Sequence, residues 1–457
     1  MNALRIGLST QTPLLRFVAE SPALAVTAAN ATLSSGQLVE NQDYQLTPGG
    51  VCRMVLPTLE QWHKTGRLEG AHWFSLQPHG PRRLAWEGLP LTLHHLTLSK
   101  DELAAYARTK EKLWADIHGL ESPRFDVDDF RFYSRYNWFT ADALLSAAGE
   151  LDIAYVHDFQ LLQVGALVGL AAPSVLRWHV PFDPARVPAY TRNFLVRTME
   201  DFDAVIVSTR RDLEGLLRAG YRGTARQLYP HIDAHDWPSV PRAEASKVED
   251  QWGLGRDDQV ILFVGRMDPI KRQDLAVKAL ARLKHSHPRA KLVLVGNGSF
   301  SGASKGGLSL SKAHLWMDEL GRLAHDLGVA DRVVFTRYVT NRVLAALYQR
   351  TDVAVLASDV EGFGLTVLES WHYGKPCVVS RGTGAAELVH DGVNGFVFPS
   401  GDDEVLANRL GRLLSDSDLR ATLGDSGRHM ARVHGVEEAA TREADVLDDV
   451  IHRFGEV

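Results

Sequence analysis

The chain has 457 residues, 45% of them hydrophobic and 23% charged, with a formal net charge of −6 at pH 7. Its length is too great for one hydrophobic core and predicts two domains of roughly 200 residues each. The negative balance excludes a general electrostatic attraction to nucleic acid or to an anionic membrane, so no nucleic-acid partner is expected. The two cysteines, Cys52 and Cys377, do not suffice for a disulfide framework or a cysteine metal site, and they fit a reducing compartment.

The first residues and the most apolar stretch carry no targeting or membrane signal. Residues 1–8 lack a basic segment followed by a long apolar core. The stretch 161–176 contains Gln163 and Pro173 and is too short to cross a bilayer. We therefore expect a soluble, cytoplasmic protein without a membrane span.

The first half of the chain contains short apolar runs that we expect to be strands of an α/β domain. They cover 4–8, 71–75, 153–156, 174–178 and 204–207. A stretch rich in Pro, Asp, Ser and Ala follows at 231–249, and we interpret it as a linker. We place an N-terminal domain at 1–240, a second domain at 241–435 and a C-terminal helical segment at 436–457.

In the second half, β-rich apolar runs alternate with helical patterns, which indicates a parallel sheet with helices on both faces. The expected strands are 260–264, 291–295, 332–335, 353–357, 377–380 and 395–398. The expected helices are 275–285, 314–327, 342–350 and 365–373. Ligands of such sheets bind beyond the carboxyl ends of the strands, so the loops at those ends form the candidate site.

The most informative motif follows the expected strand 353–357 and reads Val-Glu-Gly-Phe-Gly-Leu-Thr-Val-Leu-Glu from Val360 to Glu369. Asp359 and Glu361 precede an apolar helix whose first N–H groups favour anionic oxygens. Glu369 follows about two turns later and is expected to project from much the same helix face. Such a unit suits a phosphorylated or polyhydroxylated ligand. On spacing alone, an ordinary βα turn with solvated acidic side chains explains the motif equally well.

A second motif, Gly265-Arg266-x4-Lys271, follows the expected strand 260–264. Taken alone, this pattern is best explained by solvated charges. The Gly/Ser-rich stretch 298–312 also follows a strand, and we interpret it as a mobile lid, with plain disorder as the alternative.

Together, Glu361-x7-Glu369 and Gly265-Arg266-x4-Lys271 resemble the signature of retaining, nucleotide-sugar-dependent glycosyltransferases. The resemblance implies the GT-B fold, in which two Rossmann-like domains face each other across a cleft and the C-terminal segment often crosses back onto the first domain. It also implies that Arg266 and Lys271 clamp the donor diphosphate, which gains negative charge as the glycosidic bond breaks.

The same resemblance implies that Glu369 binds the ribose hydroxyls of the nucleotide. Glu361 and the backbone N–H groups of 363–366 would hold the transferred hexose. The donor-binding residues that it implies are Gly49, Gly50, Gly265, Arg266, Lys271, Glu361, Gly362, Phe363, Gly364, Leu365, Thr366 and Glu369.

Motifs of the first half narrow the family. In order they are Thr47-Pro-Gly49-Gly50, Leu113-Trp114, Val156-His157-Asp158 and Trp178-His179-Val-Pro181-Phe182. This succession resembles trehalose-6-phosphate synthases and the related glycosyltransferring trehalose synthases.

That resemblance implies that Asp158 accepts hydrogen bonds from acceptor hydroxyls, that His179 contacts the donor sugar near the reacting centre, and that Trp114 walls the acceptor pocket. The catalytic residues that it implies are Asp158, His179, Arg266 and Lys271. Taken singly, each residue is better explained structurally, with Trp114 as a core residue, His179 as a structural imidazole and Asp158 as a helix cap.

One position departs from the family pattern. The first strand of these enzymes normally ends in an arginine that binds the 6-phosphate of the acceptor, and Gln11 stands at that place here. A neutral amide cannot offset a dianionic phosphate. Either Lys305 or Arg16 holds the phosphate, or the acceptor is a free sugar; the expected acceptor-binding residues are Gln11, Trp114, Asp158 and Lys305.

We therefore expect a retaining hexosyltransferase that moves glucose from UDP-glucose, with ADP-glucose or GDP-glucose possible, to glucose 6-phosphate or glucose. The product would be an α,α-1,1-linked trehalose or its phosphate. The alternatives are a transferase of the same fold with glycerol phosphate, glycerate or fructose 6-phosphate as acceptor, and a catalytically inactive nucleotide-sugar-binding protein. No metal or other cofactor is expected, and a homo-oligomer stays open.

Overall fold

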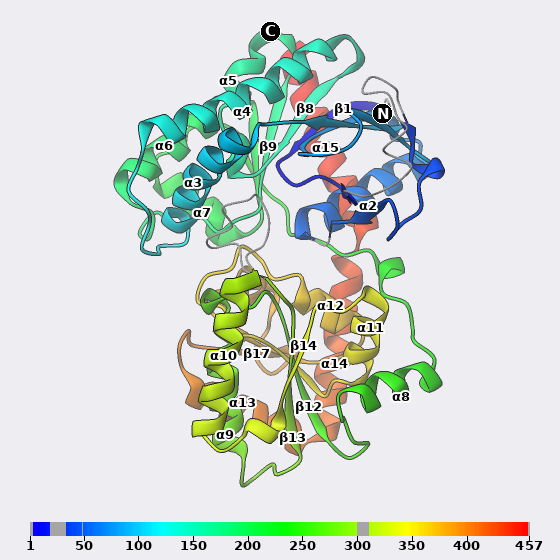
Figure 1. The fold of residues 1–457 in the computed structure, drawn as a ribbon, viewed down its shortest axis with the longest axis vertical. Helices are drawn as coiled ribbons and strands as arrows, with labels where there is room; N and C mark the ends of the chain where they lie inside the picture. Colours follow the sequence, from blue (N-terminus) through cyan, green and yellow to red (C-terminus); the bar gives the residue numbers. More distant parts are fainter. Residues whose placement is uncertain (1–2, 19–32, 48, 299–309, 456–457) are drawn as a thin grey trace. The chain divides into compact units, whose positions relative to one another are not determined.

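The computed structural model describes residues 3–18, 33–47, 49–298 and 310–455. These residues form two compact units (Figure 1). Unit 1 contains the described residues up to Tyr229 and from Val436 onward, and unit 2 contains those from Pro230 to Gly435. The division therefore falls directly after Tyr229, and the last helix belongs to the first unit.

Unit 1 is built on a nine-stranded sheet in the order β11-β10-β9-β8-β1-β5-β7-β6-β3. Neighbouring strands are parallel except at the pair of β6 and β7. The strands are β1 (Leu4–Thr10), β3 (Leu33–Ser34), β5 (Leu68–Leu76), β6 (Arg83–Trp86), β7 (Leu91–Leu96), β8 (Ile153–His157), β9 (Ser174–Trp178), β10 (Ala204–Val207) and β11 (Ala225–Gln227). A separate antiparallel pair is formed by β2 (Leu15–Phe17) and β4 (Tyr44–Leu46).

The strand order of unit 1 reverses between β1 and β8. The chain first adds β5 and β7 on one side of β1, and then adds β8 to β11 on the other side. This is the doubly wound order, in which the loops that leave the two central strands diverge and open a crevice at their carboxyl ends. Gln11 follows β1 and Asp158 follows β8, so both lie at this switch point.

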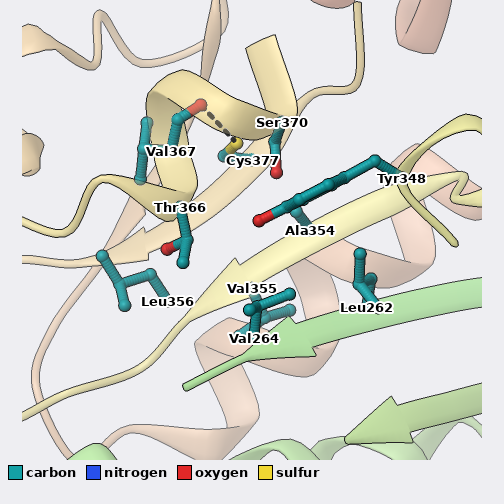
Figure 2. A pocket seen from close by; sticks show the side chains of 10 residues that line it. All are labelled: Leu262, Val264, Tyr348, Ala354, Val355, Leu356, Thr366, Val367, Ser370 and Cys377. Atoms are coloured by element: carbon teal, nitrogen blue, oxygen red, sulfur yellow. Dashed lines mark hydrogen bonds between the residues drawn. The ribbon is translucent and has the colours of Figure 1, made fainter. Parts of the chain in front are cut away.

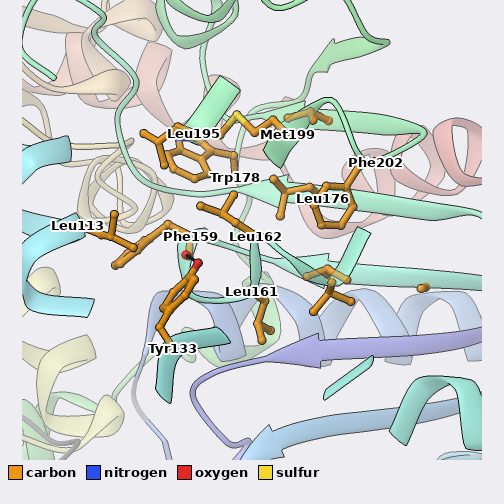
Figure 3. Close-up of a cluster of buried hydrophobic side chains, with 14 of the residues drawn as sticks. Leu113, Tyr133, Phe159, Leu161, Leu162, Leu176, Trp178, Leu195, Met199 and Phe202 are labelled. Carbon is orange, nitrogen blue, oxygen red and sulfur yellow. Dashed lines mark hydrogen bonds between the residues drawn. The ribbon is translucent and has the colours of Figure 1, made fainter. Parts of the chain in front are cut away.

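Helices cover the sheet of unit 1 and bury two apolar clusters. They are α2 (Gly50–Lys64), α3 (Lys100–Ile117), α4 (Val127–Ser146), α5 (Val164–Val168), α6 (Ala189–Met199), α7 (Arg210–Arg218) and α15 (Val436–Gly455). The α3 helix begins at a capping box, in which Ser99 and Glu102 satisfy each other's backbone N–H groups. One cluster contains the aromatic side chains of Figure 3, including Tyr133, Phe159 and Trp178.

The other cluster of unit 1 ties the end of the chain to its beginning. Ala440 and Leu447 of α15 are buried together with Leu8 of β1 and Trp62 of α2. The Trp62 indole N–H donates to the Ala440 carbonyl at 2.8 Å. The periodic apolar face of α15 therefore completes the core of unit 1.

Unit 2 contains a six-stranded, fully parallel sheet in the order β14-β13-β12-β15-β16-β17. Its strands are β12 (Gln259–Val264), β13 (Ala290–Val295), β14 (Val333–Arg337), β15 (Val353–Leu356), β16 (Cys377–Ser380) and β17 (Gly395–Phe398). Each strand matches an expected one to within two residues, because parallel strands that are buried on both faces are continuous apolar runs.

The helices of unit 2 connect these strands in βαβ fashion. They are α8 (Arg242–Gln251), α9 (Gln273–Leu283), α10 (Leu310–Asp326), α11 (Asn341–Arg350), α12 (Thr366–His372), α13 (Asp403–Ser415) and α14 (Ser417–Val433). The order is again doubly wound, and the switch point lies between β12 and β15.

The stretch 231–249 is not the open linker that its composition predicts. It contains a short 3-10 turn and most of α8, and Trp237 and Val240 are buried in unit 2. Trp237 packs edge-on against Tyr348 with ring centroids 5.6 Å apart. Pro241, one of the prolines of this stretch, is the N-cap of α8, where the absence of a backbone N–H costs little.

Candidate functional site

Both predicted motifs of unit 2 leave the sheet at its switch point. In the register of the two central strands, Ile261 pairs with Val353 and Leu262 with Ala354. The loop 265–272 follows β12, and the loop 357–365 follows β15. Sequence positions about 90 residues apart are thus brought to one edge of the sheet, where doubly wound folds bind their ligands.

The two loops are joined by a buried ion pair between Lys271 and Glu361. Their side chains are only 12% and 20% exposed, and the Ser358 hydroxyl donates to the same Glu361 oxygen at 3.0 Å. Burial lowers the pKa of the Lys271 ammonium, against the attraction of Glu361. Burial alone would raise the pKa of Glu361, but the charge and hydrogen bond of Lys271 outweigh it and hold that pKa below its ordinary value. The pair is therefore ionised, as an electrostatic site for an anionic ligand requires.

Arg266 lies beside this pair. Its Nη1 atom is 3.7 Å from Asp268, and Glu361 also acts on its charge. Burial lowers the pKa of the Arg266 guanidinium, which is offset by these two carboxylates. The structure thus brings three of the predicted donor residues, Arg266, Lys271 and Glu361, into one charged cluster.

A cation that the sequence analysis missed, Arg272, connects the two loops a second time. It adopts the left-handed conformation with φ of 58°, uncommon for an arginine. Its guanidinium is 2.7 Å from Asp359 and 3.0 Å from Asp274. Asp359 is therefore the partner of Arg272 rather than a free acid before a helix. No local sequence pattern predicts that ion pair.

Gln273 holds the main chain of the β12 loop and was also missed. This fully buried residue donates to the Arg266 carbonyl at 2.7 Å and accepts from the Trp316 indole N–H at 2.9 Å. A glutamine at a helix start resembles an ordinary polar residue in the sequence, so only its burial reveals that it positions Arg266.

Two glycines permit close approach of backbone at this edge. Gly364 has φ of 104°, and a Cβ atom there would lie 2.3 Å from a Leu356 methyl group. A Cβ atom on Gly296, which follows β13, would lie 1.9 Å from the carbonyl of Gly265. Both positions therefore require glycine, since the space is taken and the conformation is unfavourable for other residues.

The expectation that Glu361 and Glu369 share a helix face is wrong. The α12 helix begins only at Thr366, and Glu361 lies in the preceding loop, where it forms a bridge with Thr383. Glu369 is buried and accepts a hydrogen bond from the Tyr348 hydroxyl at 2.6 Å. The helix itself was predicted at 365–373, so the error lies in treating Glu361, which precedes that helix, as if it belonged to one of its faces.

A small apolar pocket lies beneath α12 (Figure 2). Thr366 and Ser370 of α12 line it together with Tyr348 and the strand residues Leu262 and Val355. The side chain of Thr366 therefore faces the interior of unit 2. Among its neighbours, Gly362 and Phe363 are buried and Leu365 occupies the cap position before α12.

At the switch point of unit 1, Asp158 has a strained backbone. Its φ of 71° and ψ of 175° lie in a region that glycine almost alone adopts. The carboxylate accepts from the His179 backbone N–H at 3.2 Å. Burial raises the pKa of Asp158 to about 7, although backbone N–H groups of His179, Phe159 and Val180 oppose this. Strain and a displaced pKa at a switch point are both typical of a functional residue.

The loop after Asp158 is held from α4. The Tyr133 hydroxyl donates to the Phe159 carbonyl at 2.6 Å, and Figure 3 shows this bond within the aromatic cluster. The Asn137 amide donates to the Gln160 carbonyl at 3.1 Å. These contacts over-determine the loop and explain how the strained conformation persists.

His179 follows β9 and lies against His157, the last residue of β8. Their Nδ1 and Nε2 atoms are 2.9 Å apart, and the rings stack with centroids 5.2 Å apart. His157 belongs to the motif Val156-His157-Asp158, but the sequence analysis predicted no function for it. Nothing in the sequence links two histidines that are 22 positions apart.

The remaining predicted residues lie on three elements of unit 1. Gly49 is the N-cap of α2, of which Gly50 is the first residue, and a Cβ atom on Gly49 would lie 3.9 Å from the side chain of Thr12. The Gly49 turn thus lies against Thr12, the residue that follows Gln11. Trp114 is half-buried on α3, and its ring packs on His118 at 4.4 Å. Lys305 lies outside the described residues.

Among the described residues, no group of three or more His, Cys, Asp or Glu side chains is arranged to hold a metal ion. No helix in the described ranges combines the length and the apolar character that crossing a bilayer demands.

Comparisons with known proteins identify the family of the chain. The family model of the Glycosyl transferases group 1 matches residues 245–430. A D-inositol 3-phosphate glycosyltransferase of Xylanimonas cellulosilytica is 33% identical over 322 residues, which cover 69% of this chain and 71% of that protein. A GDP-mannose-dependent alpha-(1-6)-phosphatidylinositol monomannoside mannosyltransferase of Mycolicibacterium smegmatis is 32% identical over 248 residues, which cover 52% of this chain and 60% of that protein.

Solved structures show the same fold at low identity. Trehalose-6-phosphate synthase OtsA matches with a TM-score of 0.75 and 18% identity, covering 97% of this chain and 99% of that chain. The Anabaena protein HepE in complex with UDP and glucose matches with a TM-score of 0.68 and 20% identity, covering 97% of this chain and 99% of that chain. The predicted fold class, α/β of the GT-B type, is thereby confirmed. With the sequence match over 71% of the Xylanimonas protein, these findings show that the chain belongs to the group 1 glycosyl transferases.

Proposed function

We propose that this chain transfers a hexose from a nucleoside diphosphate sugar to a small hydroxylated acceptor, with retention of the anomeric configuration. The observation that carries the proposal is the cluster of Arg266, Lys271 and Glu361 at the switch point of unit 2. A partly buried ammonium and a partly buried guanidinium at the carboxyl edge of a doubly wound sheet are suited to a diphosphate.

Unit 2 would bind the donor. As the bond from the anomeric carbon to the phosphate oxygen breaks, negative charge develops on the diphosphate, and Lys271 and Arg266 stabilise it more than they stabilise the intact donor. Glu361 holds Lys271 in place beforehand, so little reorganisation is required. Glu369 would bind the ribose, and backbone N–H groups near Thr366 would hold the hexose.

The donor that we propose first is UDP-glucose. Support comes from HepE, whose crystal structure contains UDP and glucose. GDP sugars are the alternative donors, because the Mycolicibacterium relative is named as GDP-mannose-dependent.

Unit 1 would bind the acceptor, with Asp158 accepting hydrogen bonds from its hydroxyls. We propose glucose 6-phosphate or glucose as the acceptor, and trehalose 6-phosphate or trehalose as the product. A second candidate acceptor is inositol 3-phosphate, which the name of the Xylanimonas relative favours. These candidates share polyol hydroxyls that could donate to the Asp158 carboxylate, and a phosphorylated one would need a cation other than Gln11 to hold its phosphate.

The proposed reaction uses no protein nucleophile. The acceptor hydroxyl oxygen forms the new bond to the anomeric carbon on the face from which the diphosphate leaves. The hydroxyl proton passes to an oxygen of the departing diphosphate, so the products are the glycoside and the free nucleotide. The protein then contributes positioning and charge stabilisation.

The test is a matrix of purified protein with UDP-glucose, ADP-glucose, GDP-glucose and GDP-mannose against glucose, glucose 6-phosphate and inositol 3-phosphate. Mass spectrometry identifies each product, and the proton coupling at the new anomeric centre reports retention or inversion. A trehalose product supports the first acceptor, and a glucosylated inositol phosphate replaces it with the second.

Two outcomes would contradict the proposal. An inverted product would remove the retaining mechanism. Tight binding of a nucleotide sugar without turnover on any acceptor would favour the inactive binding protein instead.

A further inference from the structure

The pair of His157 and His179 occupies the switch point of unit 1, and its environment restricts where its protons lie. His157 ends β8, and in the strand register it is paired with Arg177 of β9. Side chains alternate along a strand, so His179, two residues after Arg177, lies on the same face of the sheet as Arg177 and His157. His157 therefore stands between His179 at the edge and Arg177 in the interior.

Behind His157 lies a buried polar group that includes the last helix. Arg177 is 1% exposed, and its Nε atom is 3.9 Å from Glu443 of α15. The Tyr155 hydroxyl donates to Glu443, and the Tyr155 ring lies 4.5 Å from that of His157. Burial raises the pKa of Glu443 to about 8 and lowers that of Arg177 to about 9. The charge of Arg177 acts on His157 and disfavours its protonated form.

His157 is consequently a neutral imidazole. Burial, with a contribution from the charge of Arg177, lowers the pKa of His157 to about 3. A neutral imidazole carries one N–H and one bare nitrogen. Its Nδ1 atom faces His179 at 2.9 Å, whereas its Nε2 atom is buried beside a small cavity and has no hydrogen-bond partner among the described residues.

The choice between the two nitrogens follows from burial. A proton on Nε2 would be a buried donor without an acceptor, which folded proteins almost never contain, whereas a bare nitrogen there is less costly. The neighbouring charge of Arg177 also favours a lone pair over an N–H. The proton therefore lies on Nδ1 of His157 and is donated to Nε2 of His179.

We propose that His157 is a positioning residue that keeps His179 neutral, with its own proton on Nδ1. Protonation of His179 would place two N–H groups against each other across the 2.9 Å contact. The inference rests on the proposed function in one respect, namely that His179 contacts the transferred sugar.

A neutral His179 suits the proposed chemistry. The anomeric carbon gains positive charge as the diphosphate leaves, so an imidazolium beside it would oppose the reaction, while a neutral Nδ1–H can still donate to a sugar oxygen. Other charged groups around the pair are Asp158, which accepts the backbone N–H of His179, and Glu443 behind Tyr155. α2, whose side chains line the same cavity, contributes only Met54, Val55, Thr58, Leu59 and Trp62 there.

The same unit offers a matched control. His72 of β5 and His94 of β7 form a second pair, with Nδ1 and Nε2 also 2.9 Å apart and rings 5.1 Å apart. Burial lowers the pKa of His94 to about 3 as well. This pair lies on the other side of β1 from His179, so its removal tests the general effect of breaking a buried histidine pair.

The experiment measures the tautomer and the charge of the His179 imidazole by long-range 15N–1H correlation NMR on protein with 15N-labelled histidine. The variant His179→Gln identifies the signals of His179. Wild type is compared with His157→Asn, whose amide N–H replaces the Nδ1–H donor, with His157→Leu, which has no donor, and with His94→Leu. We expect an uncharged, Nδ1-protonated His179 from pH 5.5 to 8 in wild type, His157→Asn and His94→Leu. In His157→Leu we expect His179 to titrate near its ordinary pKa of about 6.5.

Transfer assays add a second readout, in which His157→Leu should lower kcat about tenfold at pH 6, with rescue in His157→Asn and little change in KM for the donor. A wild-type His179 that is protonated on Nε2, or a titration identical in wild type and His157→Leu, would overturn the proposal. Absence of transfer in wild type would instead contradict the proposed function, and the NMR titration would still decide the role of His157.

Discussion

The two switch points have the same topology and opposite electrostatics. In unit 2 the loops after the central strands are joined by ionised side chains, with Lys271 on Glu361 and Arg272 on Asp359. In unit 1 the corresponding edge presents Gln11, the pair of His157 and His179, and an aspartate whose pKa is raised. A doubly wound sheet therefore fixes where a ligand binds, and the side chains on its loops decide which ligand that is.

Under the proposed function, this contrast matches donor binding to unit 2 and acceptor binding to unit 1. Fixed cations stabilise a diphosphate, which is charged both in the donor and after departure. Neutral donors and acceptors of hydrogen bonds suit a polyol, whose hydroxyls carry no charge. The predictions below test whether each unit depends on the kind of interaction that its switch point contains.

The largest effect is expected from removing the ammonium of unit 2. Lys271→Ala should lower kcat by roughly 10²-fold or more, because it deletes a charge that faces the developing negative charge of the diphosphate. Steady-state kinetics with the best substrate pair measure this. The matched control is Lys278→Ala, since Lys278 forms only a surface ion pair with Asp274 on α9. An unchanged kcat in Lys271→Ala, or an equal loss of kcat in Lys278→Ala, would show that Lys271 does not stabilise the diphosphate.

The sequence predicts the secondary-structure elements of the two units better than it predicts the contacts between their side chains. The strands of unit 2 could be predicted because buried parallel strands are unbroken apolar runs between glycine turns. The hairpin of β6 and β7 was missed, although Leu91 and Leu93 alternate with polar residues as in a half-buried strand. The existence of elements with a strong local pattern is thus readable from sequence.

Contacts between side chains that are far apart in the sequence cannot be predicted from local patterns. Lys271 and Glu361 each belong to a recognisable motif, but nothing local states that they meet across the edge of the sheet. Arg272 escaped notice because its left-handed conformation, which aims it at Asp359, is set by the surrounding structure. The same holds for His157, whose partner lies on the next strand. The role of a residue that acts through a long-range contact can be assigned only when the fold is known.

The next effect concerns the backbone of the unit 2 site. Gly364→Ala should destabilise the protein by about 1–3 kcal/mol through its positive φ, and by about 1–3 kcal/mol more through the clash with Leu356. Gly401→Ala is the matched control, because Gly401 has φ of 84° but open space around it. Urea unfolding and UDP-glucose titration should show the larger loss of both stability and affinity in Gly364→Ala. Equal losses in the two variants would mean that the close packing at Gly364 does not shape the site.

A smaller effect is expected from the strained residue of unit 1. Asp158→Gly should be more stable than Asp158→Ala by about 1–3 kcal/mol, since both lack the carboxylate but only glycine adopts the native φ and ψ without strain. At an ordinary extended position alanine is favoured by roughly 0.5–1 kcal/mol, so the sign alone is diagnostic. Both variants should lose acceptor-dependent turnover. Chemical denaturation of the pair measures the difference, and a more stable alanine variant would show that Asp158 is not strained.

The last prediction separates the units by pH. The pKa of Asp158 is raised to about 7, so its carboxylate becomes protonated as the pH falls through 7 and accepts hydrogen bonds from hydroxyls less strongly. KM for a free-sugar acceptor should therefore rise below pH 7, by at most tenfold per pH unit. Glu361 has a lowered pKa, and acidification leaves Lys271 charged, so the affinity for UDP-glucose should be flat between pH 8 and 6.

The same titration affects stability with a definite sign. Because the pKa of Asp158 is higher in the folded chain than its ordinary value of 3.8, the contribution of this residue is most favourable below that value and declines as the pH rises to about 7. Asp158→Asn should abolish both this decline and the pH dependence of acceptor KM, while leaving UDP-glucose affinity unchanged. If the donor affinity followed the same pH curve as the acceptor KM, the electrostatic division between the two units would be wrong, because one titrating group would then serve both ligands.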